Sequence, residues 1–180
     1  MPLSRKNDLK QFAAARLVHL YETHDYGQIY DILCTRSPGF RNVDREKFGR
    51  EYLAVRLALA CHAWAVACRQ NVLLDEDLQK IFLQTVLATF QSEKVKDLAA
   101  SFGEYACLPA ETEDELAVLA ILERCFDKLS APKRQKTAKE ECVDPAFQIL
   151  VEATEGLRAS LENEFDAYLI EWSRQDGISF

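Results

Sequence analysis

The chain contains only three histidines, so the first question about its chemistry is whether these side chains could meet. They are His19, His24 and His62. A neutral imidazole is the commonest metal ligand in proteins, and a carboxylate often completes such a site. Asp25 follows His24 directly. His19, His24, Asp25 and His62 are therefore the candidate metal ligands that the sequence predicts.

The adjacent pair His24-Asp25 resembles the metal-ligating histidine and aspartate of the HD-type phosphohydrolases. The resemblance covers two residues and implies a metal-dependent phosphohydrolase. That family places a further histidine well upstream, whereas His19 lies only five residues before His24. His62 or another carboxylate would have to complete the site. The simpler interpretation is that His24 ends a helix, where the helix dipole favours its protonated form, and that Asp25 begins a turn.

Other catalytic patterns are missing or incomplete in the sequence. The Glu-x-x-His pairs of ferritin-like di-iron proteins do not occur, and neither do phosphate-binding loops or the Gly-x-Ser-x-Gly turn. The all-helical nucleotide pyrophosphohydrolases carry Glu-x-x-Glu and then Glu-x-x-Asp. This chain has those spacings in the opposite order, at 111–114 and 152–155. We therefore expect no cofactor, and enzymatic activity is the less favoured hypothesis.

Glu51, His62 and Arg69 lie within about 20° of one another on a helical wheel and so share one line of a helix. They are eleven and seven residues apart, too far for direct contact along that line. The pattern predicts a polar seam in which a buried His62 is hydrogen-bonded. No C-x-x-C-His haem attachment motif is present. A hydrogen-bonded core histidine is therefore favoured over a ligand at position 62.

The net charge and the cysteines limit the expected partners and compartment. A net charge of −7 repels phosphate backbones and anionic headgroups, so neither nucleic acid nor a membrane is expected as a partner. The six cysteines include no C-x-x-C pair. Their spacing predicts reduced thiols and gives no support for a structural zinc site. Because no apolar signal-peptide segment opens the sequence, we expect a soluble, cytoplasmic protein.

Hydrophobic periodicity places all of these residues on or between helices. The five main helices are expected over about 4–24, 44–71, 75–103, 112–129 and 144–176, with a short helix over 26–33. Ser92 is a candidate restart that would divide the third of them into two segments. Asp44 and the pair Asp144-Pro145 are typical helix starts. Thr112 and Glu115 have the spacing of a capping box, and Gly103 is a candidate stop.

The helix over 44–71 is the most informative one for the architecture. It is apolar almost all round between Leu53 and Cys68, interrupted by Arg56 and His62. A helix of this kind is surrounded by other helices. The sequence therefore predicts an all-α, single-domain bundle of five to six helices over 1–180, with 44–71 at its centre and a polar linker at about 130–143.

The last expected helix carries a longer apolar stripe than one neighbouring helix needs, and its spacing is close to a heptad repeat. Leu161, Phe165, Tyr168 and Trp172 lie towards its end, and aromatic residues are enriched at interface cores. We expect these four to contact another protein or a second copy of the chain, with a homodimer as the expected state. The leading hypothesis is a soluble adaptor or regulatory protein that acts through protein contacts. The alternative is a metal- or small-ligand-binding helical protein, such as a phosphohydrolase, that uses histidines and carboxylates between helices.

Overall fold

The computed structural model describes residues 3–23, 25–71, 80–89, 96–111, 116–131, 134–136 and 141–174. Seven α-helices and one 3-10 helix lie within these ranges. They are α1 (Leu3–Glu22), α2 (Tyr26–Arg36), η1 (Pro38–Asn42), α3 (Arg45–Gln70), α5 (Ile81–Thr89), α6 (Lys96–Glu111), α7 (Ala117–Leu129) and α8 (Pro145–Arg174). The predicted all-α bundle is confirmed. It has one more helix than expected, because the segment over 75–103, counted as one main helix with a candidate restart at Ser92, contributes both α5 and the first half of α6.

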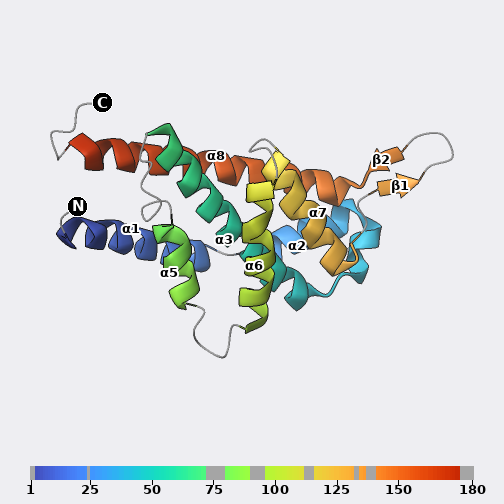
Figure 1. The fold of residues 1–180 in the computed structure, drawn as a ribbon. Helices are drawn as coiled ribbons and strands as arrows, with labels where there is room; N and C mark the ends of the chain where they lie inside the picture. Colours follow the sequence, from blue (N-terminus) through green and yellow to red (C-terminus); the bar gives the residue numbers. More distant parts are fainter. Residues whose placement is uncertain are drawn as a thin grey trace.

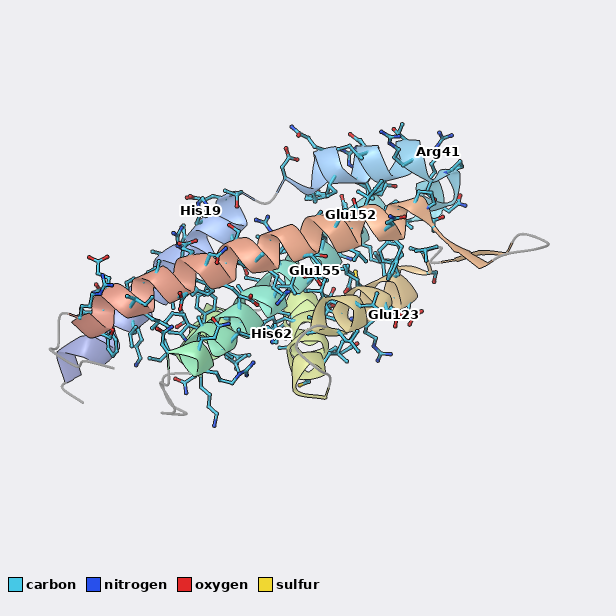
Figure 2. All side chains as sticks on the ribbon, turned by 90° about the horizontal axis from the view of Figure 1, so that it is seen from above. His19, Arg41, His62, Glu123, Glu152 and Glu155 are labelled. Carbon is cyan, nitrogen blue, oxygen red and sulfur yellow. The ribbon has the colours of Figure 1, made fainter. Side chains whose placement is uncertain are left out.

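The helices are arranged around two long members, α3 and α8 (Figure 1). α8 has 30 residues and extends over about 45 Å at 1.5 Å per residue. It packs against α3, against α2 and α7 near its start, and against α1 near its end. Figure 2 looks along the perpendicular direction, where α2 and the end of α1 that carries His19 lie on one side of α8, and α3, α6 and α7 lie on the other.

The predicted central helix is α3. Asp44 caps it by accepting a hydrogen bond from the Lys47 backbone N–H at 2.6 Å. Trp64 is fully buried and packs against Phe12, Phe82 and Phe165 at ring-centroid distances of 6.1, 6.0 and 5.5 Å. Among the helices that the structure describes, α3 alone is long and apolar enough to cross a membrane. Its apolar window is already 78% buried by the rest of the chain, as in the core helix of a bundle.

The start of α8 is fixed by a buried carboxylate. Asp144 Oδ1 accepts a hydrogen bond from the Ala146 backbone N–H at 2.8 Å. Its other oxygen accepts one from the Ser37 hydroxyl, at the end of α2, at 2.9 Å. Pro145 is the first residue of the helix, as predicted, because proline costs nothing where the backbone N–H has no helical partner. One side chain therefore joins the end of α2 to the beginning of α8.

The predicted stop at Gly103 is wrong, because α6 continues through this residue to Glu111. A glycine inside a helix costs only about 1 kcal/mol relative to alanine. Phe102 and Tyr105, on either side, are fully buried and hold this stretch against the core. The predicted capping box at Thr112 and Glu115 lies outside the described residues.

The segment expected as a polar linker at 130–143 contains a short antiparallel ribbon. Ser130 ends α7 in the left-handed conformation, with φ at 53°. Strand β1 (Arg134–Lys136) then pairs with β2 (Glu141–Val143), with Lys136 opposite Glu141. The ribbon projects beyond the bundle in Figure 1.

Candidate functional site

The candidate metal ligands lie on different helices. His19 is exposed near the end of α1, and His62 is buried in α3. Figure 2 shows them on opposite sides of α8. Asp25 caps α2, because its carboxylate accepts a hydrogen bond from the Gln28 backbone N–H at 3.2 Å. His24 lies outside the described residues.

No group of three histidine, cysteine, aspartate or glutamate side chains within the described ranges is placed to hold a metal ion. The structure therefore does not bring His19, Asp25 and His62 together as a ligand set. A site that includes His24, and with it the metal-binding hypothesis, stays a prediction.

The four residues predicted as an interface lie within the chain's own packing. Leu161, Phe165 and Trp172 are buried, and Tyr168 is half-buried. The Tyr168 ring stacks on Phe12 of α1 at 3.7 Å with an interplanar angle of 6°. α1 was not among the helices that were expected to cover α8. A homodimer built through these four residues would first have to expose them, and it stays a prediction.

A cluster of polar side chains lies between α3, α6 and α7, and we name it the Glu51 cluster. Glu51 on α3 is only 7% exposed. Its Oε1 accepts a hydrogen bond from the Ser101 hydroxyl at 2.8 Å, and its Oε2 accepts one from the Tyr105 hydroxyl. Lys128 on α7 completes the cluster. Its Nζ lies 3.6 Å from Glu51 Oε2 and donates to Ser101 Oγ at 2.9 Å.

The electrostatics of the Glu51 cluster follow from its burial. Burial raises the pKa of the Tyr105 hydroxyl above its ordinary value, and the hydrogen bond to the Glu51 carboxylate adds to that shift. Burial also raises the pKa of the neighbouring Cys125 thiol to about 12, with a further contribution from the charge of Glu51. Both groups are neutral at physiological pH, so Glu51 and Lys128 supply the charges of the cluster.

The Glu51 cluster is built to hold helices together. Two hydroxyls and one ammonium group already satisfy the Glu51 carboxylate. None of the three surface hollows described below is lined by these residues. We assign the cluster a structural role, joining α3 to α6 and α7. Glu51 was expected in a polar seam, but its partners Ser101, Tyr105 and Lys128 were not predicted, because contacts between residues on different helices leave no local signal in the sequence.

A first surface hollow, of about 330 Å³, lies between α2 and α3. It is lined by Tyr26, Glu46, Gly49, Arg50 and Leu53. Gly49 is essential to this contact, because a Cβ at position 49 would lie 2.8 Å from the Tyr26 ring.

A second hollow, of about 440 Å³, lies between α2 and the start of α8, and we name it the α2–α8 groove. It is lined by Ile32, Arg36, Pro145, Gln148, Ile149 and Glu152. The Ile32 side chain is 51% exposed there. Arg36 makes no hydrogen bond or ion pair with any residue whose position the structure describes. The Glu152 carboxylate, in contrast, accepts a hydrogen bond from Gln148 Nε2 at 3.2 Å.

A third hollow, of about 300 Å³, lies at the far end of α8, and we name it the α1–α8 pocket. Its lining residues are Asp8 from α1 and Tyr168, Glu171 and Trp172 from α8. Two aromatic rings and two carboxylates thus line the same hollow.

Comparison with known proteins gives no relative from which a function could be transferred. The chain matches no protein-family model, no curated protein and no solved structure at a significant level. Its function is therefore inferred from the geometry of the chain itself.

Proposed function

We propose that the protein is a helical adaptor or regulatory module that binds another protein through the α2–α8 groove. The observation that carries this proposal is the exposure of Ile32 in the wall of an open hollow. Pro145 and Ile149 supply further apolar surface on the opposite wall. An amphipathic helix that inserts one apolar side chain between two helices would bury this surface.

The charges of the groove select the chemistry of the bound segment. Arg36 lies in the last turn of α2 and makes no hydrogen bond or ion pair within the described part of the chain, whereas the Glu152 carboxylate already accepts a hydrogen bond from Gln148. A carboxylate near the apolar anchor of the partner would pair with its guanidinium, which can hold a carboxylate through two parallel hydrogen bonds. The proposed ligand is therefore a short amphipathic segment with one large apolar residue and a neighbouring aspartate or glutamate.

The two walls of the groove are joined before any partner arrives. The buried hydrogen bond from Ser37 to Asp144, at 2.9 Å, links the end of α2 to the start of α8. Asp144 also caps α8 through the Ala146 backbone N–H. A preformed groove saves the entropy that ordering of a loop would cost on binding, so a small contact can still bind specifically.

The proposed setting is the cytoplasm. Five of the six cysteines are described as free thiols, at positions 34, 61, 68, 107 and 125. Free thiols persist in a reducing compartment.

Selection from a library of random helical peptides tests the proposal with three forms of the protein. Peptides enriched on the wild-type chain should carry an apolar residue next to a carboxylate. Ile32→Asp should weaken their binding by at least about tenfold, because it places a charge in the apolar wall. Leu87→Asp changes a similarly exposed apolar residue on α5 and should leave binding unchanged. Peptides that bind all three forms equally would overturn the proposal.

A further inference from the structure

We propose that the α1–α8 pocket binds an organic cation, specifically an alkylated ammonium group. This inference does not depend on the α2–α8 groove, because the two hollows lie at opposite ends of α8. It starts from the lining of the pocket, in which Tyr168 and Trp172 lie beside Asp8 and Glu171. Aromatic rings attract a cation through the negative charge of their faces, and alkylated ammonium groups are bound in this way because they shed water easily.

The aromatic wall is held in place by the core beneath it. Trp172 follows Tyr168 by four residues, so both side chains lie on the same face of α8. The Tyr168 ring stacks on Phe12 at 3.7 Å, and Phe12 packs edge-on against Phe165 at 5.9 Å. Trp172 is 8% exposed and is one of the lining residues of the hollow. The rings therefore need little ordering when a ligand binds.

The carboxylates approach the same hollow from two helices. Burial raises the pKa of the Tyr168 hydroxyl, and the negative charge of the Asp8 carboxylate, which lines the same hollow, adds to that shift. Neither Asp8 nor Glu171 forms an ion pair within the described part of the chain. The nearby Arg16 is already paired with Glu164. A bound cation would supply the missing positive charge.

The other classes of ligand fit the pocket less well. Two carboxylates repel an anion, and a purely apolar ligand would desolvate them without compensation. A calcium ion takes six to eight oxygen ligands, whereas the lining residues that the structure describes offer two carboxylates and one hydroxyl. A volume of about 300 Å³ is at the lower end of the range for small-molecule sites, enough for a trimethylammonium group with part of its chain. That group occurs both in free quaternary amines and in trimethylated lysine side chains.

The two tryptophans allow a direct test by NMR, because each indole N–H gives one signal and Trp172→Phe assigns them. Tetramethylammonium chloride, titrated at constant ionic strength against sodium chloride, should shift the Trp172 signal to saturation and leave that of Trp64 in place. Asp8→Asn and Glu171→Gln should each weaken binding by about three- to tenfold. Glu123→Gln removes an exposed carboxylate of α7, outside the pocket, and should bind as the wild type does.

A Trp172 signal that responds no more to tetramethylammonium than to sodium, or an equal loss of affinity in Glu123→Gln, would overturn the proposal. Choline and a peptide with trimethylated lysine are two further probes. The one that binds with the higher affinity identifies the source of the ammonium group. Equal binding of that peptide and its unmodified lysine form would also overturn the inference. A negative result in this titration leaves the groove selection unaffected, so the two proposals fail separately.

Discussion

Glu51 carries a carboxylate into the interior of the bundle, where an uncompensated charge would cost several kcal/mol. Ser101 and Tyr105 donate hydrogen bonds to its two oxygens, and Lys128 lies 3.6 Å from one of them. The contacts come from α6 and α7, so one side chain of α3 fixes two other helices. The contribution of each donor can be measured separately.

Tyr105→Phe removes one donor to a charged acceptor and leaves the ring in place. We expect the free energy of unfolding to fall by about 1.5–3 kcal/mol, the range for hydrogen bonds to charged groups. The matched variant is Tyr30→Phe, which removes a hydrogen bond from the Tyr30 hydroxyl to the neutral Val43 carbonyl at 2.6 Å and should cost about 0.5–1.5 kcal/mol. Urea denaturation measures both. A larger loss in Tyr30→Phe would show that the Glu51 cluster contributes little.

The buried thiols make the protein sensitive to alkaline pH. Burial raises the pKa of Cys68 and of Cys125 to about 12, whereas a thiol in the unfolded chain has a pKa of about 8.5. The folded state holds the thiol proton more tightly than the unfolded state does. The contribution of these thiols to the free energy of unfolding is therefore fully present below about pH 8.5, and it is lost as the pH rises towards 12. Each thiol contributes up to about 1.4 kcal/mol per pH unit in this window.

Cys125→Ser isolates that contribution, because a serine does not titrate in this range. Between pH 8 and pH 10 the variant should lose less stability than the wild type, measured by urea denaturation at each pH. Parallel losses in the two proteins would show that Cys125 already ionises in the folded state.

At the scale of residues, the sequence predicted which side chains are buried better than it predicted which side chains contact one another. The periodicity of α3 placed Glu51 and His62 on an apolar helix, and both are buried. It did not predict that Ser101 and Lys128 meet Glu51, because that contact depends on which faces of three helices meet. The same reason explains why His19 and His62 could be compared as candidate ligands and yet lie on opposite sides of α8.

At the scale of elements, the close approach of α2 to α3 depends on Gly49. A Cβ built at this position would lie 2.8 Å from the Tyr26 ring, whereas one at Gly156 in α8 meets no atom within 4 Å. Alanine favours a helix by about 1 kcal/mol over glycine. We therefore expect Gly156→Ala to stabilise the protein by about 0.5–1 kcal/mol.

Gly49→Ala should instead destabilise the protein by about 1 kcal/mol. Overpacking costs about 1–3 kcal/mol, which exceeds the gain in helix propensity. Thermal unfolding of the two variants side by side gives the sign directly. If both substitutions raise the melting temperature, α2 and α3 are not in close contact at this point.

Local end signals predicted several elements well, because capping involves residues next to each other in the sequence. Asp44 caps α3, and Pro145 opens α8, as expected. Gly103 misled the prediction because packing of Phe102 and Tyr105 outweighs the weak preference of one glycine against a helix. The ribbon of β1 and β2 gave no signal, because three-residue strands are too short to show a period.

At the scale of the whole molecule, one aromatic contact set joins α1, α3, α5 and α8. Trp64 is fully buried among Phe12, Phe82 and Phe165. Trp64→Ala should lower the free energy of unfolding by about 3–5 kcal/mol, because it leaves a large cavity. Leu87→Ala, at a half-exposed position on α5, is the control and should change it by less than about 1 kcal/mol. An unchanged urea midpoint for Trp64→Ala would contradict the central place of α3.

The whole molecule is proposed to act by binding a protein partner at the α2–α8 groove, and photo-crosslinking in the cells that express the gene tests this most directly. A photoreactive amino acid at position 32 should give one discrete crosslinked product, identified by mass spectrometry. The same probe at position 87, on an exposed residue of α5, should not give it. Ile149→Asp, on the opposite wall of the groove, should abolish the product without unfolding the chain. Identical products from positions 32 and 87, or a product that persists in Ile149→Asp, would contradict the proposal.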